Sequence, residues 1–335
     1  MTAEEMMLRR LYGQHLLEKT DALTVVRDLC GVQAQFLSHA MHAMRIRSHR
    51  ADVSGMVKGW TNRGTMHLFA ENDLPMFLHR DRRHFLRPVD RLDGDGVMTA
   101  QRKAYFAEMI VDAVGQGIDG REALKSVCAS GGMTEMELRH AFDPWGGLIR
   151  ALCEAGRICQ KPQEQKAYRL CPPFEPMEAE AARLAMCRRY FTHFGPATVK
   201  DAAYFFGFTQ AEVKRCIAQL PVHETLLDGR TYFFIDHGEA AGDCPECLFL
   251  AGFDQMILGY DKKESLFLPE ENVRDVFSRA GMVHPTVLVR GRVAGVWKMK
   301  NNHLQVCLFA PGERSGIVEA AGETWAQLSG VEFCG

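Results

Sequence analysis

The sequence lacks several features that would place the protein in a specialised class. Its 335 residues contain no apolar run of the roughly 20 residues that a membrane span needs. The Met1–Ala3 start has neither the basic nor the apolar region of a signal peptide. We therefore expect a cytoplasmic protein with reduced thiols and no membrane partner. Lys and Arg number 40 and Asp and Glu 42, so the net charge does not identify a nucleic-acid-binding protein.

A metal-binding pattern is lacking as well. Eleven cysteines are present, but their number is odd and their spacing is irregular. Cys244 and Cys247 form a C-x-x-C pair, and neither a second pair nor histidines lie at the spacing that a zinc site usually has. We expect no metal and no organic cofactor, and we interpret the thiols as buried or partly exposed side chains.

The pattern that is present is a repeat of capped helices followed by a hairpin. In its clearest copy, residues 194–236, Gly207 separates two helical segments and Asp228-Gly229 marks a two-residue turn between two alternating segments. Helix N-terminal boxes are predicted at Thr198–Asp201, Thr209–Glu212 and, in a second copy, Thr134–Glu137. Two helices at a turn followed by a β-hairpin are the winged-helix arrangement.

The other copies are predicted from the same signals. The second continues with a helix at 147–155 and a short hairpin made by 157–160 and 166–170. The amino-terminal region offers a weaker copy, with helices expected at 4–17, 22–29, 38–48 and 53–60 and a strand at 65–69. The last part of the chain alternates as strands at 286–290, 293–300 and 304–309.

These segments predict an α+β fold that is mainly helical, with tandem winged-helix domains and a C-terminal β element. We expect four parts: a winged-helix-like domain at 1–90, winged helices at 91–175 and 176–240, and a β-rich region with a hairpin at 241–335. Winged helices also serve as protein-interaction or structural modules, so the pattern alone does not establish DNA binding.

Cationic side chains favour DNA binding. Lys214 and Arg215 lie on the predicted recognition helix, beside Gln210, and Arg230 lies on the wing, where they suit contact with phosphates and base edges. A second basic segment, residues 79–91, contains Arg80, Arg82, Arg83, Arg87 and Arg91. Such a run is either a solvated face or a track for phosphates.

Five segments in order resemble a known family. They are 31-GVQAQ-35, 60-WTNRGTMHL-68, 195-GPATVKDAAYFFGF-208, 248-LFLAGFDQMILGYDKK-263 and 285-PTVLVRGRVAGVWK-298. Together they cover nearly the whole chain, which resembles the AlkZ-like family of winged-helix DNA glycosylases, bacterial proteins that remove alkylated bases, including bases in interstrand crosslinks. The resemblance implies that tandem winged helices form a concave cationic surface for duplex DNA.

The resemblance also implies a catalytic role for Gln33 and Gln35, which match the double-glutamine version of the family's signature. On spacing alone the two amides are better explained as caps or bridges between helices around Gly31. A purine alkylated at N7 of guanine or N3 of adenine is already cationic and leaves without being protonated. An amide oxygen can hold a water and direct a dipole at the developing sugar cation, although it is too weak a base to take the proton outright.

Other residues of the matching segments are candidates for DNA contact. Arg63 and Thr65 are placed to hold phosphates, and His67 is either near the site or part of the core. The probing hairpin of the family has two candidates here, the Asp228-Gly229 wing and the turn that carries Arg290 and Arg292. Asp254 either orients a neighbour or caps a turn, and Trp60 and Trp297 are expected in the core. The sequence departs from the family pattern in two places. Ala251 and Gly252 stand where the family usually has prolines, and Arg290 stands where an aspartate is common.

The sequence thus predicts a monofunctional DNA glycosylase for cationic alkylated purines, with N7-alkylguanine first and N3-alkyladenine and interstrand crosslinks as further substrates. Its expected partner is double-stranded DNA carrying alkylated bases, and we expect a monomer associated with the nucleoid. The alternative is a winged-helix DNA-binding protein without catalysis, either a regulator or a factor that shields lesions. A scaffold for protein interaction is a third possibility.

Overall fold

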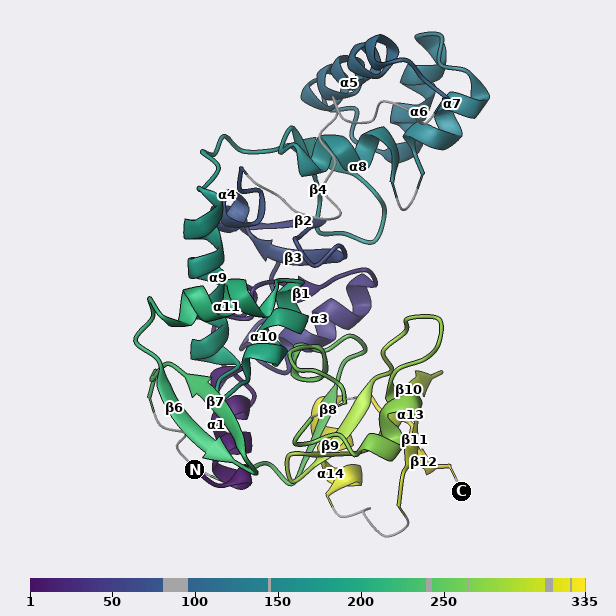
Figure 1. Cartoon of the computed structure of the whole chain (residues 1–335). Coiled ribbons are helices and arrows are strands. Elements are labelled where there is room, and N and C mark those ends of the chain that lie inside the picture. The colour runs from purple at the N-terminus through teal and green to yellow at the C-terminus, as the bar shows by residue number, and fades with distance from the viewer. Residues whose placement is uncertain are drawn as a thin grey trace. The chain divides into compact units, whose positions relative to one another are not determined.

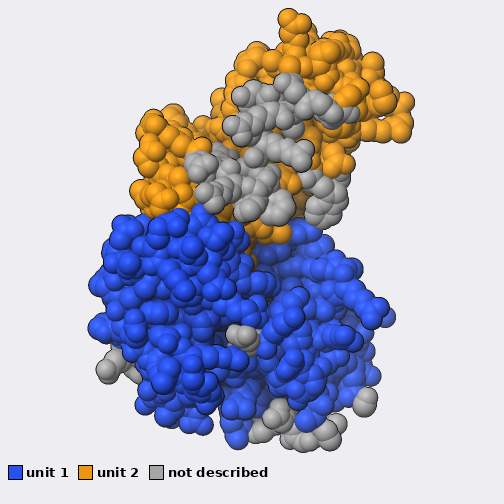
Figure 2. Space-filling view, viewed as in Figure 1, with its two compact units in different colours: residues 1–52, 184–335 blue, residues 53–183 orange. Residues whose placement is uncertain are grey.

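The chain folds into two compact units of mixed helix and strand. The computed structural model describes residues 1–80, 96–143, 146–238, 243–263, 265–310, 316–325 and 327–334. Unit 1 comprises Met1–Asp52 and Leu184–Gly335, and unit 2 comprises Val53–Arg183 (Figure 2). Across these described ranges, no helix is both long enough and apolar enough to cross a membrane. The predicted α+β class is confirmed, whereas the predicted domain 1–90 is divided between the units after Asp52.

Unit 1 contains a helical part that is built on the end of α9. Its elements are α1 (Ala3–Gly13), α2 (Ala22–Asp28), β1 (Val32–Gln33), α3 (Leu37–Arg45), the part of α9 (Ala179–His193) from Leu184 on, α10 (Val199–Phe206), α11 (Gln210–Ile217), β6 (His223–Leu227) and β7 (Arg230–Phe234) (Figure 1). Tyr190 stacks on Phe194 at 5.0 Å between ring centroids, and Phe205 packs on both rings. Buried aromatic rings therefore join α9 to α10, since each ring removes a large apolar area from water.

Local signals set the boundaries of the segment from α10 to β7. Thr198 and Thr209 each accept a hydrogen bond from the backbone N–H three residues on, and both predicted boxes are complete. Gly207 ends α10 in the left-handed conformation, with a φ of 70°. Asp228 and Gly229 have φ values of 48° and 74°, as a tight turn between twisted antiparallel strands requires. The helices and the hairpin predicted here are confirmed as elements.

The C-terminal part of unit 1 is a five-stranded sheet in the order β12-β11-β10-β9-β8. Its elements are β8 (Cys247–Leu250), α12 (Gln255–Leu258), η3 (Glu270–Asn272), α13 (Val273–Val276), β9 (Thr286–Val289), β10 (Arg292–Lys300), β11 (His303–Leu308), α14 (Ile317–Thr324) and β12 (Gly330–Phe333). Buried residues of β8, β9, β11 and α14 form one core, with Trp297 packed against it as predicted. A disulfide joins Cys307 to Cys334, which corrects the expectation that all thiols are reduced.

Unit 2 combines a sheet with a group of four helices. Its elements are β2 (Met56–Trp60), β3 (Met66–Ala70), η1 (Glu71–Asp73), α4 (Leu74–Phe77), α5 (Ala100–Gly115), α6 (Arg121–Ser130), α7 (Glu135–Ala141), α8 (Gly147–Glu154), β4 (Ile158–Gln160) and β5 (Tyr168–Leu170). Strands β3, β2, β4 and β5 are neighbours in that order. A buried core joins α5, α6, α7 and α8 to β4 and β5, and Trp60 packs against it as predicted.

The helix predicted at 53–60 is wrong. Residues Met56–Trp60 form strand β2, which pairs antiparallel with β3 from Met56 opposite Ala70 to Trp60 opposite Met66. Gly55 has a φ of 70°, which a right-handed helix does not allow. Pairing with β3 and burial of this short apolar segment decide its conformation. The hydrophobic period of only eight residues does not distinguish a helix from a strand.

Candidate active site

The Gln33–Gln35 segment begins at a sharp reversal after α2. The N–H of Gly31 bonds to the carbonyl of Val26 at 2.7 Å, and that of Cys30 bonds to the carbonyl of Arg27 at 3.1 Å. This pair of bonds is a Schellman motif, and Cys30, with a φ of 53°, occupies the left-handed position where glycine is usual. Gly31 is also left-handed, with a φ of 84°. The reversal sends the chain from the end of α2 directly into β1.

Gln33 lies in β1 and Gln35 lies at a bend before α3. Ala34 between them is fully buried, Gln33 is 7% exposed, and Gln35 is partly exposed. Within the part of the chain that the structure describes, neither amide forms a hydrogen bond with another protein group, and Phe36 at the N-terminus of α3 caps no backbone group. The interpretation of the two amides as helix caps or bridges is therefore not supported. Both amides retain their hydrogen-bonding capacity for a water or a substrate.

An aromatic cluster adjoins the glutamine pair. Phe36, which is 41% exposed, stacks on Phe253 at 5.9 Å between ring centroids and meets the edge of His39 at 5.9 Å. Phe253 holds a φ of 58°, which an aromatic residue seldom adopts. A Cβ atom on Gly252 would lie 3.0 Å from Cε1 of His39, so a larger residue there would displace the ring. Gly252, at one of the departures from the family pattern, thus leaves room for His39.

Neither Phe36 nor His39 was predicted from the sequence as part of the site. An exposed aromatic ring directly after Gln35 offers a face on which a base can stack. Burial lowers the pKa of His39, so this imidazole is neutral near pH 7. The position of Phe36 next to Gln35 was the only sequence feature that could have indicated a role in the site. The exposure of the Phe36 ring could not be predicted, because it is a property of the folded chain.

Asp254 is a structural residue in this arrangement. Its carboxylate accepts two hydrogen bonds from the guanidinium of Arg47, at 2.9 and 2.6 Å, and both side chains are fully buried. It also accepts the N–H of Met256 at 2.9 Å and so caps α12. Arg47 donates further to the carbonyls of Gln14 and Ala43. The two roles proposed from the sequence, orienting a neighbour and capping a turn, are both seen.

The candidates in unit 2 differ in exposure. Arg63 and Thr65 are partly exposed on the segment between β2 and β3, where they remain candidates for phosphate contact. His67 is fully buried in β3, and its Nδ1 lies 2.9 Å from the carbonyl oxygen of Thr65 and 3.2 Å from Oγ1 of Thr61. Burial holds its pKa well below the ordinary value of 6.5, and the neighbouring charge of Arg63 adds to the effect. This burial places His67 in the core, which is one of the two positions that the sequence left open, and a direct contact with DNA is not indicated.

Exposed cations lie on α11 and on the hairpin that follows it. Lys214 and Arg215 are exposed on one helix, and Arg230 is exposed at the start of β7, beside the turn. Gln210 is also exposed, at the first position of α11. This hairpin is anchored on α1, because the guanidinium of Arg9 lies over the ring of Phe234 at 4.4 Å. The side chains predicted for phosphate contact are thus accessible here.

The turn that carries Arg290 and Arg292 has a different environment. Both arginines line a cavity of about 750 Å³ at the N-terminus of α1, whose lining includes Glu4, Glu5, Asp243 and Glu246. The guanidinium of Arg290 lies 3.9 Å from the carboxylate of Glu246. Carboxylates repel phosphates, so this turn is the weaker of the two candidates for a hairpin that probes DNA.

The basic segment at 79–91 is described only in part. Arg80 is exposed and pairs with Glu175 at 2.6 Å and with Glu178 at 3.1 Å. Exposed pairs of this kind are weak, so they leave Arg80 able to exchange a carboxylate for a phosphate. Arg82, Arg83, Arg87 and Arg91 lie outside the described residues.

Comparison with known proteins supplies the family. The model of a family described as "DNA glycosylase AlkZ-like" matches residues 26–326. An "Interstrand DNA cross-link repair glycosylase" of Streptomyces sahachiroi is 26% identical over 355 residues, covering 96% of this chain and 95% of the relative. The solved structure of the Streptomyces sahachiroi DNA glycosylase AlkZ has a similar fold, with a TM-score of 0.79 at 22% identity, over 100% of this chain and 99% of that one.

The family match decides between the functional classes that the sequence left open. It extends over most of the chain and includes the glutamine pair, α3 and strands β8 to β11 of the C-terminal sheet. A regulator or lesion-shielding factor without catalysis is therefore set aside. The chain belongs to the AlkZ-like DNA glycosylase family, and it is a DNA N-glycosylase.

Proposed function

We propose that this glycosylase hydrolyses the N-glycosidic bond of cationic alkylated purines in duplex DNA, with a water held by Gln33 and Gln35. The observation that carries the proposal is the state of the two amides, which form no hydrogen bond with other protein groups among the described residues. An amide unengaged by its own protein has both its acceptor oxygen and its donor nitrogen available for ligands.

The chemistry of the substrate explains why amides suffice. A base alkylated at N7 of guanine or N3 of adenine carries a positive charge and departs as a neutral molecule. The transition state then resembles the flat sugar cation of glycoside hydrolysis, with a water on the opposite face of the ring. Two amide oxygens can orient this water and stabilise the cation by their dipoles, and positioning of a reactant alone can contribute several kcal/mol.

Weak activation of the water also limits the reaction. Undamaged purines leave as anions unless they are protonated, and an amide neither donates a proton readily nor accepts one. Gln33 and Gln35 would therefore act on lesions that are already good leaving groups and spare normal DNA. The first substrate class is N7-alkylguanine, followed by N3-alkyladenine.

Interstrand crosslinks are a further substrate that we propose on two grounds. The Streptomyces sahachiroi relative is named for crosslink repair. In this chain Gln35 and Phe36 are both accessible, and Phe36 provides an aromatic face next to the amide. A base that remains tethered to the opposite strand needs such an open site, because extrusion into a closed pocket would strain the tether.

Binding to duplex DNA is assigned to the exposed cations of α11 and the hairpin. Lys214, Arg215 and Arg230 would contact phosphates, and the exposed Gln210 on the same helix would reach base edges. Arg63, Thr65 and Arg80 are secondary candidates in unit 2. Arg290 and Arg292 retain a lesser role because of the carboxylates around them. We propose that the protein acts as a monomer in the cytoplasm, where it binds the DNA of the nucleoid.

The decisive experiment measures release of 7-methylguanine from alkylated duplex DNA with enzyme in excess. Each of Gln33→Ala and Gln35→Ala should slow release, and the double variant should lower the rate constant by on the order of a hundredfold or more. Gln305→Ala is the matched control, because this glutamine is on β11 and bonds to Glu332. Its release rate should equal that of the wild type.

Two further measurements separate catalysis from binding and define the substrate. The affinity for DNA and its dependence on salt should be unchanged in the double variant, because in the proposed mode the amides hold the water and contact no phosphate. A duplex with a nitrogen-mustard crosslink should be unhooked by the wild type. Undiminished release of 7-methylguanine by the folded double variant would remove the role assigned to the two amides.

A further inference from the structure

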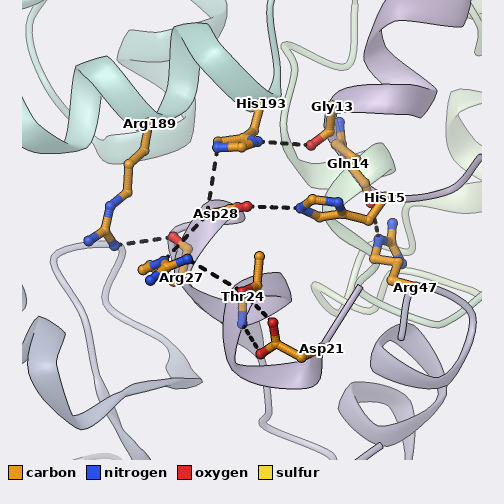
Figure 3. Close-up of polar contacts among 10 residues, drawn as sticks. All are labelled: Gly13, Gln14, His15, Asp21, Thr24, Arg27, Asp28, Arg47, Arg189 and His193. Atoms are coloured by element: carbon orange, nitrogen blue, oxygen red, sulfur yellow. Dashed lines mark hydrogen bonds and ion pairs between the residues drawn. The ribbon is translucent and has the colours of Figure 1, made fainter. Parts of the chain in front are cut away.

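Two histidines and an aspartate converge at the end of α2, and none of the three has a role in the proposed reaction. Nε2 of His15 lies 2.9 Å from Oδ2 of Asp28, and Nε2 of His193 lies 3.6 Å from Oδ1 of the same carboxylate (Figure 3). The potential ligand atoms of the three residues all lie within 4.8 Å of one another. Their side chains are 14–18% exposed, so the cluster is largely shielded from water.

The backbone brings these residues together at the ends of three helices. His15 follows α1 as the left-handed residue of a Schellman motif, with a φ of 58° and with its N–H bonded to the carbonyl of Tyr12. Glycine is the usual residue at this position, since a side chain there costs conformational energy. Asp28 is the last residue of α2, and His193 is the last residue of α9. A strained histidine aimed at a carboxylate is a reason to look for a function.

The hydrogen bonds of His193 fix which of its nitrogens faces Asp28. Nδ1 lies 3.1 Å from the carbonyl oxygen of Gly13, and a carbonyl only accepts, so Nδ1 carries the proton. In the neutral ring, Nε2 then presents a lone pair toward Oδ1 of Asp28. Two electron-pair donors thus face each other, an arrangement that a shared cation stabilises.

The charges around Asp28 favour the same conclusion. The carboxylate lies at the C-terminal end of α2, where the helix dipole is negative and a cation is favourable. The nearby positive charge is Arg27, with Nε 3.6 Å from Oδ1, and its side chain is half exposed and screened by water. Arg189 donates to the backbone carbonyl of Arg27 and not to the carboxylate. A positive charge between the two imidazoles would be better placed to offset Asp28.

We propose that His15, Asp28 and His193 bind one divalent transition-metal ion of the zinc class. Imidazole nitrogen and carboxylate oxygen are ligands that zinc uses at about 2.0–2.2 Å, which in a tetrahedron places ligand atoms about 3.4 Å apart. The separations of 2.9 and 3.6 Å lie on either side of that value. The bond from Nδ1 of His193 to the Gly13 carbonyl is the outer interaction that orients a metal-binding imidazole.

The ion would serve the architecture of the site and not the reaction. Asp28 is five residues before Gln33, and the Schellman reversal at Cys30 lies between them. Cross-linking the ends of α1, α2 and α9 would therefore fix the point from which the glutamine segment starts. Coordination through Nε2 of His15 requires only that its proton move to Nδ1. Nothing in this proposal depends on the role given to Gln33 and Gln35.

The test is metal binding by the full-length protein without DNA. Protein treated with a chelator and then titrated with zinc should take up one equivalent, with an increase in Tm as expected for a ligand of the folded state. His193→Gln and Asp28→Asn should each weaken zinc binding by about tenfold to a hundredfold or more. Losses of about this size are typical even for residues that only hydrogen-bond to a metal ligand. His223→Gln is the matched control: His223 also pairs with an aspartate, Asp236, at 3.2 Å, but both are exposed.

Cobalt substitution identifies the ligands without any variant. Cobalt bound at this cluster should give the visible bands of a nitrogen and oxygen site, without the near-ultraviolet charge-transfer band that thiolate ligands produce. This measurement decides the question even when a variant fails to fold. Absence of tight zinc binding, a thiolate spectrum, or unchanged affinity in folded His193→Gln would each overturn the proposal.

Discussion

Two buried polar side chains from family-matching segments have opposite hydrogen-bonding states. Asp254, in unit 1, has two bonds from Arg47 and one from the N–H of Met256. His67, in unit 2, uses Nδ1 toward Thr65 and Thr61, whereas its Nε2 is shielded from solvent and has no hydrogen-bond partner among the described residues. Both residues were named in the sequence analysis because they lie in segments that resemble the family.

The difference shows that the fold can tolerate a buried polar side chain in two physically different ways. A buried charge is tolerable only when it is paired and fully bonded, and Asp254 meets that condition by holding Arg47 and capping α12. A buried neutral ring with one unbonded nitrogen carries a smaller cost and keeps a hydrogen-bonding capacity. Removing Asp254 should therefore damage the fold, and changing His67 should alter stability with pH.

The largest effect is expected from Asp254→Ala. This change leaves the guanidinium of Arg47 charged, fully buried and without its carboxylate, a situation that typically costs 3–5 kcal/mol, and about 1 kcal/mol more is expected from the lost cap. Urea denaturation followed by circular dichroism measures the loss. Combining Asp254→Leu with Arg47→Met should be less destabilising than Asp254→Ala alone, since no buried charge then remains. Equal or additive losses would mean that the pair is not coupled as the structure indicates.

His67 should produce a smaller effect that depends on pH. Burial keeps the folded ring neutral, because its pKa lies well below 6.5, whereas the unfolded chain binds a proton near that ordinary value. The unfolded state thus gains protons first as the pH falls, and this residue lowers stability progressively below about pH 6.5 and not above it. In His67→Gln, the unfolding free energy should depend less steeply on pH between about 6.5 and 5, by at most about 1.4 kcal/mol per pH unit.

Denaturation of the wild type and His67→Gln in parallel at several pH values checks this prediction. The amide of glutamine can still donate to the Thr65 carbonyl, so the comparison removes the titration more than the hydrogen bond. Identical slopes in the two proteins would show that the folded ring titrates at its ordinary pKa. The contrast with Asp254 would then rest on hydrogen bonding alone.

Local features of this molecule could be predicted from the sequence because their causes are local. The capping boxes at Thr198 and Thr209 and the turn at Asp228-Gly229 each depend on residues within a few positions of one another. The 53–60 helix failed because the strand there is decided by pairing with β3. A period read from a short segment contains no information about such a partner.

The candidate site residues could be named from the sequence, but their arrangement could not. Gln33 and Gln35 came from the resemblance, whereas the exposure of Phe36 and the stacking of Phe253 on it appear only in the fold. The pair Arg47–Asp254 is separated by 207 residues. His193 meets His15 and Asp28 from far along the chain, and a search for metal-binding spacing in sequence does not detect a site assembled in this way.

The smallest expected effect concerns Thr61 and sharpens the account of His67. Oγ1 of Thr61 lies 3.2 Å from Nδ1 of the ring and accepts the N–H of Arg63 at 3.3 Å. Thr61→Val removes this oxygen while keeping the shape, and the expected loss is about 0.5–1.5 kcal/mol, as for one buried hydrogen bond. Because burial, and not this hydroxyl, is the main cause of the low pKa of His67, the loss should be the same at pH 5 and pH 8. A loss that changes with pH would show that the hydroxyl helps to set the protonation state of the ring, which would make the polar contacts of His67 as specific as those of Asp254.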